Sequence, residues 1–250
     1  MNRLLSAETL RLRTSRVYWL LAAGTVVVIA GGVAATAATP SFTAGTSAAR
    51  SALAVAGLAQ AVTLIAGVLS VTGEFRHKTI TAAVLITPGR TPLLAAKLIT
   101  MAAAGLVLGL LTTGTATAIT LPLLAARHIP SGISSADTAA IIGGGGIAAA
   151  LFAALGVGAG AIIRNQAGAI VAVLALLYVA EPLLGFTPHL GTAIQQYGLG
   201  GLSSAAIHTT GLPGTDHLLG QTAAVLVLAG YAAALLLAGA AVLRDRDITA

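Results

Sequence analysis

Six apolar stretches, each long enough to cross a membrane as a helix, make up most of this chain. A spanning helix needs about 20 predominantly apolar residues. The chain is 57% hydrophobic and only 8% charged, whereas soluble proteins carry about 25% charged residues, so it cannot form the polar surface of a soluble domain. We therefore predict an all-α membrane protein in which residues 1–250 form a single transmembrane domain, with six spans near residues 18–38, 51–72, 92–126, 139–163, 167–186 and 220–243.

The basic residues predict the orientation of these spans. Cytoplasmic loops of membrane proteins carry an excess of Lys and Arg. If the N-terminus is cytoplasmic, eleven of the thirteen basic residues fall inside, and only Arg50 and Arg127 fall outside. We therefore expect a multi-pass protein of the cell membrane with both termini in the cytoplasm. Lys97 lies about one turn inside the third span, and we expect its side chain to extend outward to the interface.

Several classes of function lack their sequence signatures in this chain. There is no cysteine, no pair of histidines at metal-binding helical spacing, no G-x-S-x-G nucleophile motif and no phosphate-binding G-x-x-x-x-G-K-[ST] loop. The basic residues lie at the ends of apolar spans rather than on one face, which does not favour nucleic-acid binding. We therefore predict no catalytic residues, metal or cofactor, and any use of ATP would need another protein.

Glycines within the spans predict close helix packing. Gly105/Gly109 and Gly156/Gly160 have the GxxxG spacing that lets helices approach closely in lipid. Because the chain has 30 glycines, such matches also arise by chance, and general tight packing is favoured over a specific dimer motif. The run Gly143–Gly146 could locally unwind its helix where it is buried in protein.

Glu181 is the clearest ionisable residue within a predicted span, and such residues are candidates for function. It could bind a proton, a cation or a substrate, or it could simply lie near enough to the outer interface to be hydrated. The following Pro182 lacks a backbone N–H and should kink the helix. The segment 187–219 could then hold short interfacial or re-entrant helices.

A polar segment between the second and third spans carries the strongest functional signal. Residues 73–90 contain five ionisable side chains, in the order Glu74, Arg76, His77, Lys78 and Arg90. Residues 79–86 can form a short amphipathic helix that Pro88 ends, because the residue before a proline is displaced from helical conformation. A plain solvated loop is the simpler alternative. Residues 1–17 are predicted to be a basic flank, an interfacial helix, or both.

The order of residues in this segment resembles the first cytoplasmic loop of ABC-2 type permeases, which are the membrane subunits of one class of ATP-binding-cassette exporters. The residues that carry the resemblance are Glu74, Phe75, Arg76, Thr79, Ile80, Pro88 and Arg90. The N-terminal segment is similar to the opening interfacial helix of that family through Glu8, Arg11, Arg13 and Arg16.

The resemblance implies that the short helix between spans two and three couples the chain to a separate ABC ATPase subunit. Glu74 and Arg76 would pair with charges on the N-terminal helix or on the ATPase. A second permease chain, identical or different, would complete the transporter in the lipid bilayer, and the substrate would be hydrophobic or amphipathic. Two other classes remain open: a non-transporting resistance, immunity or sensor-partner protein, and a stand-alone ion-coupled carrier that uses Glu181.

Overall fold

The computed structural model describes residues 2–38, 45–76, 90–163, 165–187, 190–207 and 217–245. All regular structure in these ranges is helical. The elements are α1 (Asn2–Thr14), α2 (Arg16–Ala38), α3 (Gly45–Ala54), the 3₁₀ turn η1 (Val55–Gly57), α4 (Leu58–Arg76), α6 (Arg90–Ala126), α7 (Ser135–Ile163), α8 (Gln166–Ala175), the π-helical turn η2 (Leu176–Ala180), α9 (Glu181–Gly185), α10 (Gly191–Tyr197), α11 (Leu199–Ala206) and α12 (Gln221–Asp245).

Six helical stretches within these ranges are long and apolar enough to cross a membrane. Six helices of the predicted length and apolar character are therefore present, and each boundary agrees with the prediction to within four residues. The stretches are Arg16–Thr36, Ala52–Glu74, Pro92–Ala126, Ser135–Ile163, Gln166–Gly185 and Gln221–Val242. The coupling helix predicted at residues 79–86 lies outside the described residues. The N-terminal segment is helical as α1, and its placement at a membrane interface remains a prediction.

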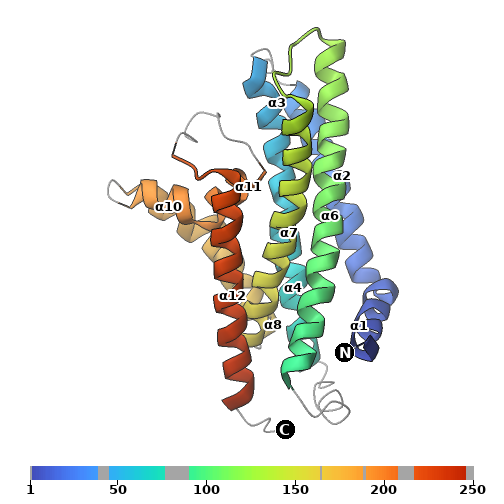
Figure 1. Cartoon of the computed structure of the whole chain (residues 1–250), viewed down its shortest axis with the longest axis vertical. Coiled ribbons are helices and arrows are strands. Elements are labelled where there is room, and N and C mark those ends of the chain that lie inside the picture. Colours follow the sequence, from blue (N-terminus) through green and yellow to red (C-terminus); the bar gives the residue numbers. More distant parts are fainter. Residues whose placement is uncertain are drawn as a thin grey trace.

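The bundle is arranged around α7, the most buried of the six spans. Figure 1 shows α4, α6 and α12 alongside α7, and these three helices make its most extensive contacts. α2 packs on α6, while the fifth span, formed by α8, η2 and α9, is the least buried. α1 and the C-terminal part of α12 lie at one end of the bundle, which we call the α1 end; α3 lies at the opposite end, the α3 end.

Glycines allow this close packing around α7. A Cβ atom added at Gly156 would lie 2.1 Å from the carbonyl oxygen of Leu64 in α4, and one added at Gly67 would lie 2.2 Å from the carbonyl oxygen of Ala153 in α7. Only glycine therefore permits the observed α4–α7 approach. The Gly105/Gly109 pair lies against α7 in the same way. The prediction of general tight packing is confirmed, because both GxxxG pairs are used within the chain.

The expected unwinding at the Gly143–Gly146 run is wrong, since α7 is a continuous α-helix from Ser135 to Ile163. Neighbouring elements crowd the last three of these glycines instead, whereas a Cβ at Gly143 would meet nothing within 4 Å. A Cβ at Gly144 would meet the carbonyl of Ala206 in α11 at 1.9 Å, and one at Gly145 would meet the side chain of Thr113 in α6 at 2.1 Å. The run therefore lets two neighbours approach α7, and the helix keeps its own hydrogen bonds.

The fifth span changes its helical geometry just before Pro182, where the sequence predicts a kink. Pro182 cannot donate a backbone hydrogen bond, and the preceding turn widens into the π-helix η2 before α9 begins at Glu181. The expected short helices in segment 187–219 are present as α10 and α11; α11 lies beside the upper part of α12 in Figure 1, and α10 extends away from the bundle.

The main hydrophobic core lies where α4, α7, α11 and α12 meet. Its centre is Phe152, which is fully buried together with Leu202 and Leu228. Two smaller buried clusters lie towards the α3 end, around Ile29 and Leu53, and near the α1 end, around Met101.

Candidate functional site

A cluster of four charged side chains links three helices at the α1 end; we call it the charge cluster, and it consists of Glu8, Arg11, Glu74 and Lys97. The Nζ atom of Lys97 in α6 lies 2.8 Å from Oε1 of Glu8 in α1 and 2.6 Å from Oε1 of Glu74 in α4. The same Glu74 oxygen accepts a 2.6 Å hydrogen bond from Arg11 in α1. Two acids and two bases therefore form a charge-balanced network.

Most of this network is removed from solvent. The side chains of Lys97, Glu74 and Glu8 are 2%, 7% and 10% exposed, whereas that of Arg11 is 43% exposed. The expected outward extension of Lys97 is therefore wrong. A buried ammonium is tolerated when paired charges and hydrogen bonds replace its hydration, and two carboxylates do so here.

An apolar group lies next to the charge cluster along the same helices. Leu12 of α1 and Tyr18 of α2 pack against a buried group that includes Val71, Leu94 and Met101. Val71 lies three residues before Glu74, and Leu94 lies three residues before Lys97, so one helical turn separates these apolar contacts from the ion pairs. Because buried ion pairs are screened less than exposed ones, separating α1 from α4 and α6 would break strong interactions.

The charge cluster joins the end of the second span to the start of the third, on either side of the polar segment between them. Glu74 lies two residues before the end of α4, and Lys97 lies seven residues after the start of α6. Their contact holds together the two helices that flank residues 77–89. Of the predicted coupling residues, Thr79, Ile80 and Pro88 lie outside the described residues, while Phe75, Arg76 and Arg90 lie at helix ends whose side chains are not described.

The four residues singled out near the N-terminus divide into two pairs. Glu8 and Arg11 belong to the charge cluster. Of the two alternatives that the resemblance implied for Glu74, a partner on the N-terminal helix or on the ATPase, the structure shows the first, Arg11. Arg13 and Arg16 are exposed near the junction of α1 and α2. The sequence analysis missed the role of Lys97, although a lysine inside a predicted span was a signal that it needed a buried partner.

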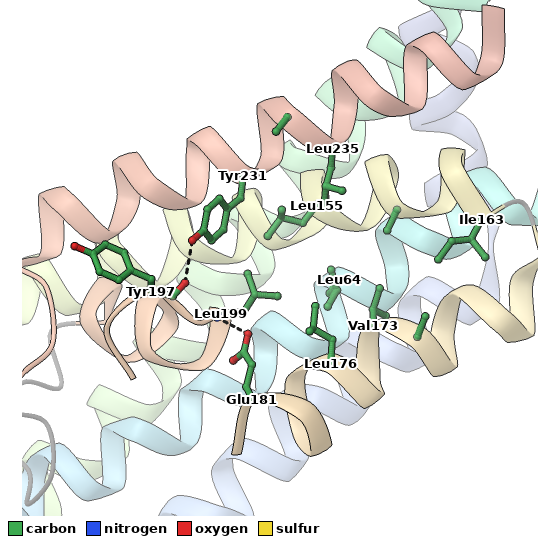
Figure 2. Close-up of a pocket in the computed structure, with 13 residues that line it drawn as sticks. Leu64, Leu155, Ile163, Val173, Leu176, Glu181, Tyr197, Leu199, Tyr231 and Leu235 are labelled. Atoms are coloured by element: carbon green, nitrogen blue, oxygen red, sulfur yellow. Dashed lines mark hydrogen bonds between the residues drawn. The ribbon is translucent and has the colours of Figure 1, made fainter. Parts of the chain in front are cut away.

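A second candidate site is an apolar pocket of about 450 Å³ between α12 and the fifth span, with contributions from α4, α7, α10 and α11. Figure 2 shows Glu181, Tyr197 and Tyr231 at one end of the pocket and Ile163 at the other. The lining residues are Leu64, Leu155, Ala159, Ile163, Ala172, Val173, Leu176, Glu181, Tyr197, Leu199, Tyr231, Ala234 and Leu235.

Glu181 caps a helix as well as lining the pocket. Its two carboxylate oxygens accept hydrogen bonds from the backbone N–H groups of Leu199 (2.6 Å) and Gly200 (2.9 Å), the first two residues of α11. A carboxylate at this position satisfies donors that have no partner within the helix and interacts favourably with the helix dipole. The sequence analysis did not predict this role, because Leu199 lies 18 positions from Glu181.

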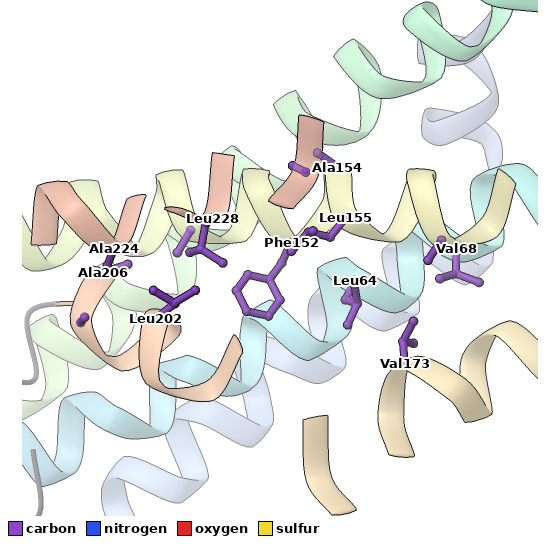
Figure 3. Packing of buried hydrophobic residues seen from close by; sticks show 14 of the residues in the cluster. Leu64, Val68, Phe152, Ala154, Leu155, Val173, Leu202, Ala206, Ala224 and Leu228 are labelled. Carbon is purple, nitrogen blue, oxygen red and sulfur yellow. The ribbon is translucent and has the colours of Figure 1, made fainter. Parts of the chain in front are cut away.

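The wall of the pocket is continuous with the main core. Leu64, Leu155 and Val173 belong to both, and Figure 3 shows these side chains beside Phe152, which projects from α7 between Leu64 and Leu202. The closely packed helices α4 and α7 therefore form one side of the pocket, while the little-buried fifth span forms the other.

Neither site has the composition of a metal centre. Over the described ranges, no group of three His, Cys, Asp or Glu side chains is placed to hold a metal ion. The charge cluster is an internally neutralised structural network, and the pocket offers one carboxylate at the end of an apolar cavity. No protein-family model matches the chain, and no curated protein matches it.

Proposed function

We propose that this chain is the permease subunit of an ABC-2 type transporter, which exports an amphipathic or hydrophobic substrate with energy from a separate ATPase subunit. The observation that carries the proposal is the charge cluster. It contains Glu8, Arg11 and Glu74, three residues on which the family resemblance rests, and it lies at the base of the segment that would be the coupling loop.

The cluster supports this function because it joins the two helices that flank the coupling loop, so that both would respond to a movement of the loop. A force applied to residues 77–89 reaches α4 and α6 at their contact between Glu74 and Lys97. Glu8 and Arg11 join α1 to the same contact. The three helices would therefore move together when the ATPase closes, which is how rigid-body switching transmits a movement across a domain. Six spans form half of such a transporter, so a second permease chain is part of the proposal.

Co-purification tests the proposal. The chain is isolated from its native membrane in mild detergent, and the associated proteins are identified by mass spectrometry. We expect an ATPase with a phosphate-binding loop to accompany the wild type and to be lost with Arg76→Ala, which lies beside the coupling loop. Arg50→Ala removes a charge at the α3 end and should leave association unchanged. Normal membrane insertion of Arg76→Ala together with undiminished ATPase recovery would contradict the proposal.

A stand-alone ion-coupled carrier is the second candidate, because Glu181 lies at the end of an apolar pocket. That function predicts flux by the purified chain in proteoliposomes, driven by an ion gradient and lost in Glu181→Gln. A protein that moves nothing would instead give no flux with or without an ATPase. Flux that depends on ATP and on the ATPase supports the leading proposal over both.

A further inference from the structure

The pocket between α12 and the fifth span is polar at one end only. Among its described lining residues, Glu181 is the single charged residue, and no Lys, Arg or His is present. The groups at the same end are the Tyr231 hydroxyl and the Tyr197 carbonyl, joined by a 3.2 Å hydrogen bond (Figure 2). The remaining lining is aliphatic from Leu155 to Ile163.

The polar end offers hydrogen-bond acceptors. The two oxygens of an ionised carboxylate accept about four hydrogen bonds in all, and α11 supplies two of them. The Tyr231 hydroxyl donates its proton to the Tyr197 carbonyl, so its oxygen is left as a further acceptor. A ligand that fits this end must therefore donate hydrogen bonds, and a positive charge would complement Glu181.

The position of the carboxylate strengthens this reading. Glu181 lies within the fifth span, four residues before its end at Gly185, which is about 6 Å along the helix. An acidic side chain within a span is costly unless it is paired. The helix cap provides polar contacts to Glu181, and a bound cation would add the opposite charge that the lining residues lack.

We propose that this pocket binds a single-chain cationic amphiphile, with its ammonium group against Glu181 and its alkyl chain along α7 towards Ile163. The cavity volume of about 450 Å³ falls in the range of roughly 300–1,000 Å³ typical of ligand sites. Leu155 and Ile163 are eight residues apart, or about 12 Å along the helix, which matches an alkyl chain of about ten carbons. Phospholipids and fatty acids fit less well, because no basic residue in the lining would pair with their phosphate or carboxylate.

As a substrate assignment this inference rests on the proposed transport function, but binding can be measured on the full chain alone. The chain is placed in lipid nanodiscs without any ATPase, and binding of radiolabelled dodecylamine is measured above that of empty discs. Dodecylamine is an ammonium ion at neutral pH. Dodecanol and dodecanoic acid carry the same tail with a neutral and an anionic head. We expect the amine to bind about tenfold or more tightly than either.

Two matched variants test the location. Ala234 lines the pocket from α12, whereas the adjacent Ala233 does not, and both are exposed. Ala234→Phe should fill the cavity and weaken amine binding by about tenfold or more, while Ala233→Phe should leave it unchanged. Glu181→Gln should bring amine binding close to that of dodecanol. The inference is overturned if all three headgroups bind alike, if dodecanoic acid is preferred, or if the two Phe variants behave alike.

The binding result and the ATPase result are independent. If no ATPase accompanies the wild-type chain but dodecylamine binds selectively, the transport proposal is rejected and the binding site is retained. Association of the ATPase without selective amine binding would keep the transporter and reject this ligand class.

Discussion

Replacing Lys97 with methionine should destabilise the protein more than removing Arg11 from the same network. Methionine keeps the approximate length and volume of lysine but leaves Glu8, whose side chain is 10% exposed, without its ion-pair partner. Removing one partner of a buried ion pair costs about 3–5 kcal/mol. Arg11 is 43% exposed, and Glu74 keeps Lys97 when Arg11 is lost, so Arg11→Gln should cost no more than about 1 kcal/mol.

The single tryptophan makes this difference measurable. The indole N–H of Trp19 donates a 3.0 Å hydrogen bond to the carbonyl of Arg13, so its fluorescence reports on the junction of α1 and α2. Thermal unfolding in nanodiscs should show the midpoint of Lys97→Met lowered by on the order of 10 °C, and that of Arg11→Gln by about 3 °C. A circular dichroism melt of each variant accompanies the fluorescence, because the tryptophan reports on only one part of the bundle.

The reasoning would be refuted if Lys97→Met lowered the midpoint no more than Arg11→Gln. Addition of Glu8→Gln to Lys97→Met supplies an internal check, because it removes the unpaired acid. The double variant should recover about 1–3 kcal/mol of the loss, the coupling expected between side chains in one buried network. Additive losses would mean that Lys97 and Glu8 do not stabilise each other.

Three further changes test other parts of the structure. Gly156→Ala should destabilise the α4–α7 contact by about 1–3 kcal/mol through overpacking, whereas Gly143→Ala on the same helix meets nothing within 4 Å and should stabilise by about 1 kcal/mol; equal melting temperatures would contradict the packing account. Glu181→Ala should cost about 0.5–2 kcal/mol and speed hydrogen exchange at the first amides of α11, and unchanged exchange there would refute its capping role. Gln221→Leu removes two donated bonds of 2.7 and 2.8 Å to α7 and α11; it should cost about 2 kcal/mol, and a melting midpoint equal to the wild type would count against that tie.

The six spans could be predicted because their signal is local. Each stretch is apolar over 20 residues or more, and that length alone indicates a crossing helix. Which span lies at the centre could not be read in this way, since mean hydropathy is nearly equal among them, from 2.0 to 2.3. The glycines of α7 were the available sign, and their meaning depends on which backbones approach them.

The two candidate sites depend on partners that are distant in sequence. Lys97 and Glu8 are 89 positions apart, so no local pattern indicates that they pair. A lysine near the end of a span is expected to direct its ammonium group towards water, and that prediction was wrong because Lys97 is buried against Glu8 and Glu74. Glu181 was recognised as unusual, but its bonds to α11 require a chain reversal through α10 that no local pattern fixes. Burial makes these pairings strong, and burial follows from the packing of whole helices.

Cysteine cross-linking between the coupling segment and the ATPase would test the central claim most directly. The chain contains no cysteine, so a single introduced thiol gives a clean signal. Thr79→Cys places the thiol in the predicted coupling helix. The matched control is Ser135→Cys; Ser135 is exposed at the start of α7, at the α3 end of the bundle. We expect a thiol-to-amine cross-linker to join the ATPase to the chain carrying Thr79→Cys and not to the control. Cross-linking of neither variant within a co-purifying complex, or of both equally, would contradict a coupling role for this segment.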